Sequence, residues 1–247
     1  MTDKQPNILQ RIVKSATMIE ANELKTVLLS FSFVFILMAA YYVLRPVRDA
    51  MASDWSNTEI SFLWNIQLVL STAVVALYGL ACSRIRFQLL VPAVYIFFAV
   101  TFVGFYFAAS AVSDRVLVDK AFYLWVTLFS LLHLSVFWSL MADLFNKEQS
   151  RRVFAFIAAG ASAGAAIGPL GASLIVTDIG VDNLMLIASL MLVIPLPIIF
   201  YLQHLKSAEL HNEDVHADLS SAKIGGNPLA GFKMFFTNPY LLAIGAF

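Results

Sequence analysis

The sequence predicts an all-α integral membrane protein with six transmembrane helices and the start of a seventh. Of its 247 residues, 60% are apolar and 13% are charged, whereas soluble proteins carry about 25% charged residues. The mean hydropathy is +0.80, and apolar runs of about 20 residues, the length that spans a bilayer as a helix, recur along the chain. We therefore expect a multi-pass protein whose main surroundings are the lipid bilayer.

Six apolar runs are long enough to cross the bilayer. In chain order they are Thr26–Leu44, Ile60–Cys82, Phe87–Ser110, Ala121–Ala142, Val153–Thr177 and Leu184–Leu202. A further apolar run begins near Tyr240 and stops with the sequence at Phe247. We expect an N-terminal cytoplasmic segment (1–25), a six-helix bundle (26–202), a polar cytoplasmic linker (203–237) and the truncated start of a seventh helix (238–247). This layout is typical of the first half of a longer protein.

Lysine and arginine are divided unequally between the two ends of these spans. The N-terminal segment, the second-to-third loop, the fourth-to-fifth loop and the tail after the sixth span hold twelve of them: Lys4, Arg11, Lys14, Lys25, Arg84, Arg86, Lys147, Arg151, Arg152, Lys206, Lys223 and Lys233. The opposite side holds four, which are Arg45, Arg48, Arg115 and Lys120. Because cytoplasmic loops carry the excess of positive charge, this distribution predicts a cytoplasmic N-terminus.

Composition argues against several other classes of protein. The net charge is zero, so a nucleic-acid partner has no electrostatic support. The single cysteine, Cys82, and four scattered histidines show no spacing typical of metal ligands, so we expect no metal and no cofactor. The spans contain no HExxH pattern and no nucleophile beside a base, and an enzyme is therefore not expected.

The end of the first span carries the most informative residues, Tyr41-Tyr42-Val43-Leu44-Arg45-Pro46-Val47-Arg48-Asp49. Charges there are costly unless they face headgroups, water or a polar path through the protein. Guanidinium groups match phosphate and carboxylate oxygens, so a polar path predicts contacts of Arg45 and Arg48 with an anion. The alternative is an interfacial anchor with snorkelling arginines and belt tyrosines. The three charged residues share about one turn if the helix continues, unless Pro46 ends it.

A few other polar side chains lie at membrane depth. Asn65 and Gln67 are on the second span, and with Tyr41 and Tyr42 they are candidates for further substrate contacts. His133 lies near the middle of the fourth span, where a histidine lines a cavity, relays protons or makes an interhelical hydrogen bond. Pro195 and Pro197 predict a kink in the sixth span.

The fifth span carries glycines at every fourth position, Gly160, Gly164 and Gly168, followed by Pro169. Residues four apart share a helix face, and small residues on one face let another helix approach closely. The pattern predicts either static packing or a tight, bendable contact between moving helices.

The fourth-to-fifth loop contains Asp143, Arg151 and Arg152 beside a tight turn. These charges form either a latch at the cytoplasmic side or simply the positive charge that orientation requires. Arg84, in the second-to-third loop, belongs to the same side.

The order of six spans, a cytoplasmic linker and the beginning of a further span resembles that of the major facilitator superfamily, whose members have two six-span halves. Gly79 and Arg84 match its second-to-third loop motif, whereas Ser83 replaces the aspartate and Arg86 the second glycine. Part of the fifth-span motif, often associated with exchangers, is similar to Gly164, Gly168 and Pro169.

A second resemblance is to the nucleotide (ATP/ADP) translocases of bacteria and plastids, over roughly residues 24–175. It rests on Tyr42, Leu44, Arg45, Arg48, Asp49, Trp138, Arg151, Arg152, Phe154 and Gly160. The resemblance implies a secondary active transporter of a small anionic substrate, similar to an ATP:ADP antiporter, in a bacterial inner membrane. It further implies that Arg45 and Arg48 contact the anion and that Asp49 orients them.

Other interpretations stay open at the level of sequence. The alternatives are a non-transporting membrane assembly or scaffold protein, and an inactive fragment of a transporter. We also expect that the 247-residue form alone does not transport, because it needs the missing C-terminal half or a second copy to complete a cavity.

Overall fold

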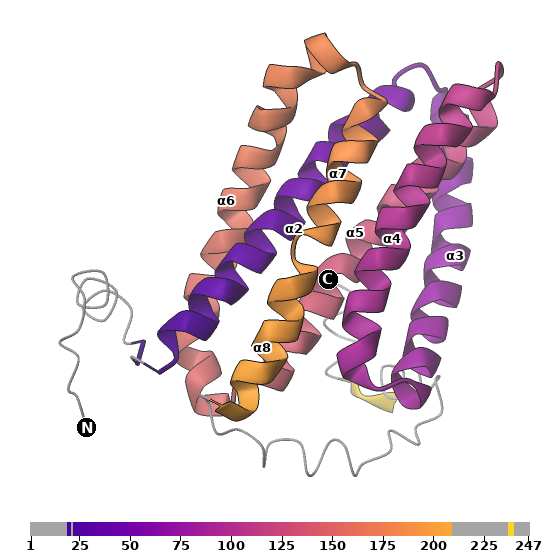
Figure 1. Ribbon diagram of the computed structural model, residues 1–247. Coiled ribbons are helices and arrows are strands. Elements are labelled where there is room, and N and C mark those ends of the chain that lie inside the picture. Colours follow the sequence, from indigo (N-terminus) through magenta and orange to yellow (C-terminus); the bar gives the residue numbers. More distant parts are fainter. Residues whose placement is uncertain (1–18, 21, 209–236, 240–247) are drawn as a thin grey trace, which may run out of the picture.

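The computed structural model describes residues 19–20, 22–208 and 237–239 (Figure 1). Most of the expected N-terminal segment, most of the linker and most of the start of a seventh helix lie outside the described residues. The helices are α2 (Leu24–Met51), α3 (Asn57–Arg84), α4 (Phe87–Ala111), α5 (Val116–Leu144), α6 (Lys147–Ile179), α7 (Asn183–Val193) and α8 (Leu196–Ala208). Six stretches of this part of the chain are long and apolar enough to cross a membrane. The predicted all-α fold with six spans is confirmed.

Several helices extend beyond the expected spans, among them α2 at its end and α6 at its start. Helix α2 continues through Pro46 to Met51, seven residues beyond the expected end. The turn between α5 and α6 contains only Phe145 and Asn146, because the Asn146 side chain accepts hydrogen bonds from the backbone N–H groups of Glu148 (3.0 Å) and Gln149 (2.9 Å). This cap satisfies the first free donors of α6, and the helix therefore begins well before the expected Val153.

The sixth span is divided into two helices, α7 and α8, at Ile194 and Pro195. Proline has no backbone N–H to continue the hydrogen-bond ladder, so the observed break lies where the sequence predicts a kink. Helix α8 then runs to Ala208, and residues 203–208, expected to open the linker, are helical.

The helices form two rows (Figure 1). One row contains four helices in the order α6, α2, α5 and α3, and each helix contacts the next. Helix α4 and the α7–α8 pair form the second row, in which α7 contacts α4 and also α2. Among the described helices, the first row therefore has one side packed against the second row and one side that no other described helix covers, which we call the open side.

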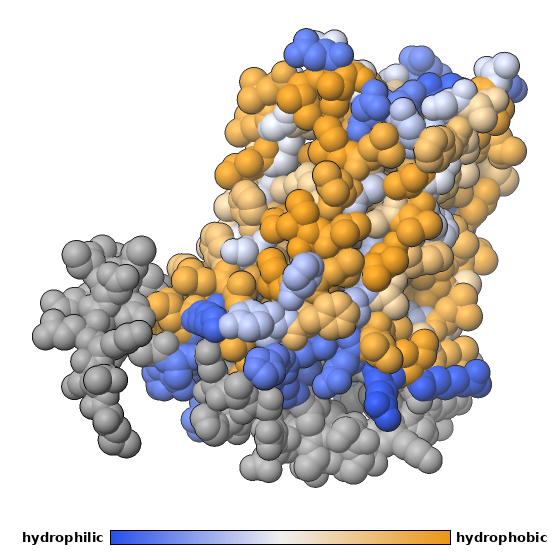
Figure 2. Space-filling view, viewed as in Figure 1, coloured by the Kyte–Doolittle hydropathy of each residue, from blue (hydrophilic) through white to orange (hydrophobic). Residues whose placement is uncertain are grey.

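The core lies between the two rows and is rich in aromatic rings. Phe33 of α2 contacts Tyr95 of α4 and Phe137 of α5, with ring centroids 5.5 and 5.1 Å apart. Phe98 and Phe102 of α4 lie against the Phe129 ring of α5. Space filling shows polar residues at both ends of the bundle and an apolar middle (Figure 2), as a membrane-spanning protein requires.

Candidate functional site

The site expected from the sequence lies on the C-terminal part of α2, the end away from the chain's N-terminus. Arg48 is directed toward α5, and 15% of its side-chain surface is exposed. Its Nε and Nη2 donate to Asp49 Oδ1 at 2.9 and 2.7 Å, and its Nη1 donates to Thr127 Oγ1 at 3.4 Å. The guanidinium also lies 5.3 Å from the centre of the Tyr123 ring. Arg48 is therefore both neutralised and held in place.

Arg45 has the same chemistry in a different environment. Its side chain is 47% exposed, and its Nε lies 3.7 Å from Asp49 Oδ2, beyond hydrogen-bond distance. The guanidinium carbon lies 5.6 Å from the centre of the Tyr42 ring, within the range of a cation–π contact. Arg45, Arg48 and Asp49 together carry one net positive charge. Because Asp49 already binds Arg48, that charge lies on the exposed guanidinium of Arg45.

The direction of Arg45 follows from the contacts of α2 with its neighbours. Tyr41 contacts His133 and Phe129 of α5, whereas Ala39 contacts Gly168 of α6. At 100° per residue, Arg45 projects between the α5-facing and α6-facing sides of α2. This sector belongs to the open side of the four-helix row.

A polar and aromatic network joins α2, α3 and α5 at this end, and sequence reasoning missed it. Lys120 of α5 forms an ion pair with Glu59 of α3 at 2.8 Å. Trp64 of α3 donates through Nε1 to the Tyr123 hydroxyl at 3.3 Å, and the Tyr123 ring also contacts Trp55. The sequence signal for one member existed, because Ser56-x-x-Glu59 is a capping box that fixes Glu59 at the start of α3.

The remaining expected contacts are placed apart from the arginines. His133 is buried, with 3% exposed, and its Nδ1 lies 2.8 Å from the Phe129 carbonyl of its own helix. Asn65 donates to the Ser61 carbonyl and Gln67 donates to the Ser71 hydroxyl, both at 2.9 Å and both within α3. Of the expected partners, the structure brings Tyr42 and Asp49 to Arg45.

The glycine face of α6 packs directly on the backbone of α2. A Cβ added at Gly160 would lie 2.7 Å from the Phe31 carbonyl oxygen, and one at Gly168 would lie 2.6 Å from that of Ala39. A Cβ at Gly164 would collide with the Phe35 carbonyl oxygen. The α2–α6 contact is the most extensive between any two described helices. Pro169 lies inside α6, which continues to Ile179.

The charges at the opposite end of the bundle form ion pairs with other elements of the chain. Asp143 pairs with Lys206 of α8 at 3.2 Å. Arg152 binds Glu20 at 2.7 Å and the fully buried Glu23 at 2.5 Å. The charge network exists, but its partners lie in the N-terminal segment and in α8.

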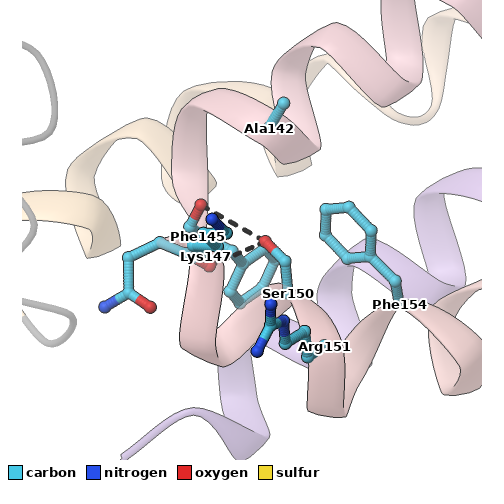
Figure 3. Close-up of a pocket in the computed structure, with 7 residues that line it drawn as sticks. Ala142, Phe145, Lys147, Ser150, Arg151 and Phe154 are labelled. Atoms are coloured by element: carbon cyan, nitrogen blue, oxygen red, sulfur yellow. Dashed lines mark hydrogen bonds between the residues drawn. The ribbon is translucent and has the colours of Figure 1, made fainter.

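Arg151 and Arg84 are exposed, and no ion pair involves either within the described part of the chain. Arg151 instead lines a pocket of about 670 Å³ at the α5–α6 turn (Figure 3). The pocket is lined by Ala142, Phe145, Asn146, Lys147, Ser150, Arg151 and Phe154.

Comparison with known proteins agrees with the fold. No curated protein and no solved structure matches the chain. The model of the major facilitator superfamily matches residues 12–247, which include all the described helices. The chain therefore belongs to the major facilitator superfamily, and it is a multi-pass membrane protein of the transporter type.

Proposed function

We propose that this transporter carries an anionic solute and that Arg45 and Arg48 contact it. A phosphate-bearing solute such as a nucleotide is the first candidate, because guanidinium groups bind phosphate oxygens with two parallel hydrogen bonds. The observation that carries the proposal is the exposed Arg45 guanidinium, which projects from the open side of the helix row with its charge only distantly shared by Asp49.

The two arginines have different roles in this proposal. Asp49 and Thr127 fix Arg48, so its position is set before a solute arrives. Arg45 is free to turn toward the solute, and Tyr42 supports its guanidinium from one side. His133 is not included among the contacts, because it is buried.

The open side of the row is also where a second set of helices belongs. Transporters of this type hold the substrate near the midplane between two repeats, which rock around it. We propose that the sector of α2 that carries Arg45 faces such a second half, or a second copy, and that transport proceeds by exchange. We further propose a bacterial inner membrane and a cytoplasmic N-terminus, for which the distribution of Lys and Arg is the support.

Uptake by the full-length protein in proteoliposomes tests the proposal. The panel contains labelled ADP, inorganic phosphate and citrate, with glucose as a neutral solute. We expect the wild type to take up at least one anion. We expect Arg45→Gln and Arg48→Gln to lose about tenfold or more, because a hydrogen bond to a charged group contributes about 1.5–3 kcal/mol.

The matched control is Arg86→Gln, which removes an exposed arginine from the other end of the bundle and leaves uptake unchanged. Equal incorporation of all variants into the vesicles excludes loss of folding. Full anion uptake by the Arg45→Gln, Arg48→Gln double variant contradicts the proposal.

A further inference from the structure

The pocket at the α5–α6 turn combines positive charge with an apolar wall (Figure 3). Lys147 and Arg151 are the charged residues of its lining, and no acidic side chain lines it. Both cations are exposed, and neither takes part in an ion pair among the residues that the structure describes. The lining of the pocket therefore includes two cationic side chains that have no ion-pair partner in the described part of the chain.

The charged residues next to the pocket form ion pairs outside it, unlike Lys147 and Arg151. Arg152, the next residue along the chain, donates hydrogen bonds to Glu20 and Glu23 on a different side of α6. Asp143, just before the turn, faces Lys206. The two cations of the pocket are thus not required to hold the helices together.

The rest of the lining offers little hydrogen bonding. The Ser150 hydroxyl donates to the carbonyls of Asn146 (2.7 Å) and Phe145 (3.4 Å), and the Asn146 side chain accepts from the first turn of α6. The wall is formed by the Phe145 and Phe154 rings, whose centroids lie 6.3 Å apart, and by Ala142. A ligand here meets two cationic donors beside an aromatic surface.

We propose that this pocket is a second anion site, for a phosphate ester that carries an apolar or aromatic group. Lys147 and Arg151 would bind the phosphate oxygens, and the half-buried Phe154 ring and Ala142 would contact the rest of the molecule. The volume of about 670 Å³ lies in the range of about 300–1,000 Å³ that small-molecule sites occupy. The inference rests on the proposed anionic substrate. It places a second binding site for that substrate at the end of the bundle opposite Arg45.

A soluble nucleotide and a phospholipid headgroup share this chemistry, and cysteine labelling distinguishes them. In a background of the full chain from which every native cysteine, Cys82 included, is replaced by serine, Ala142→Cys places a single thiol in the lining of the pocket. The protein is held in phosphatidylcholine nanodiscs, and its reaction with a neutral maleimide is timed alone, with ADP, with inorganic phosphate, and with phosphatidylglycerol in the disc. The control thiol is Gln88→Cys, exposed at the same end on α4.

We expect ADP or phosphatidylglycerol to slow labelling at position 142 about fivefold or more and to leave position 88 unchanged. Protection by ADP identifies a soluble phosphate ester, and protection by phosphatidylglycerol alone identifies a lipid headgroup. Adding Lys147→Gln and Arg151→Gln removes the protection, whereas Arg86→Gln does not. Absence of protection by every probe, or protection that survives loss of both cations, overturns the inference.

This outcome is separable from that of the proposed function. If protection fails while Arg45→Gln abolishes uptake, the second site is wrong and the proposed function stands. If ADP protects position 142 while the Arg45→Gln, Arg48→Gln double variant transports fully, the pocket is an anion site and the role of the two arginines is wrong.

Discussion

Two arginines one turn apart on α2 differ in what surrounds them. Arg48 has a carboxylate, a hydroxyl and an aromatic ring around its guanidinium, whereas Arg45 keeps about half of its side chain exposed. Asp49 was predictable from sequence because it lies on the same turn of the same helix. Thr127 and Tyr123 were not, because they come from α5 and depend on how two helices align.

Another pair of neighbouring arginines gives a direct test at the same scale. Arg152 binds the fully buried carboxylate of Glu23, so Arg152→Gln leaves a buried charge without its partner. Leaving a buried carboxylate without its partner is destabilising, and we expect a lower midpoint of thermal unfolding in detergent. Arg151→Gln, which breaks no ion pair among the described residues, leaves the midpoint unchanged. Equal midpoints for the two variants contradict the assigned role of Arg152.

At the scale of elements, the apolar runs predicted every membrane-crossing helix. Their ends were predicted less well, because polar caps and not hydropathy decide where a helix begins. Asn146 and Gln149 form a reciprocal cap at the start of α6, and their spacing was present in the sequence. The pairings between helices at the two ends, such as Arg115 with Asp182, were beyond sequence reasoning because the partners lie 67 residues apart.

The α2–α6 contact depends on the absence of side chains at three positions. Gly164→Ala forces a Cβ into the Phe35 backbone, and overpacking of this kind costs about 1–3 kcal/mol. We expect the thermal midpoint of the variant to fall in detergent. Gly171→Ala on the same helix is the matched control, because nothing lies within 4 Å of its added Cβ. Unchanged stability of Gly164→Ala shows that the two helices are not held as closely as described.

Helix α3 is the least buried of the six spans. At its first turn it is held to α5 by the Lys120–Glu59 ion pair, with 26% and 45% of the two side chains exposed. Exposed pairs contribute little to the stability of the whole protein, so we expect Lys120→Gln to free the start of α3 without unfolding the bundle. Hydrogen exchange of residues 57–64 should rise several-fold and exchange of α2 should not. A global increase in exchange contradicts this account.

At the scale of the whole molecule, ion pairs fasten the helices to one another at both ends. One end has Arg115 with Asp182 and Lys120 with Glu59, and the other has Lys206 with Asp143 and Arg152 with Glu20 and Glu23. Hydrogen bonds from Arg115 to the Asp182 carboxylate also raise the pKa of Arg115. Together with the glycine contact, these pairs make the six spans suited to move as one rigid body.

The same architecture leaves one side of the four-helix row open. Tyr42 and Arg45 lie there toward one end, and the α5–α6 pocket lies at the other end. The side chains that cover the opposite, second row are exposed and apolar, including Phe97 of α4 and Leu190 of α7. We therefore expect water on the open side and lipid on the other.

Accessibility of introduced cysteines to a charged, membrane-impermeant thiol reagent tests this central claim most directly. The full-length protein is freed of native cysteines, Cys82 included, and held in vesicles made permeable to the reagent on both sides. Single cysteines then replace Tyr42, Arg45 and Ala142 on the open side, and Phe97, Leu190 and Phe200 on the lipid side. We expect the first three to react and the last three to be protected. Protection of positions 42 and 45 to the same degree as 97, 190 and 200 would contradict the account, because Arg45 would then lie in lipid and not beside a path for an anion.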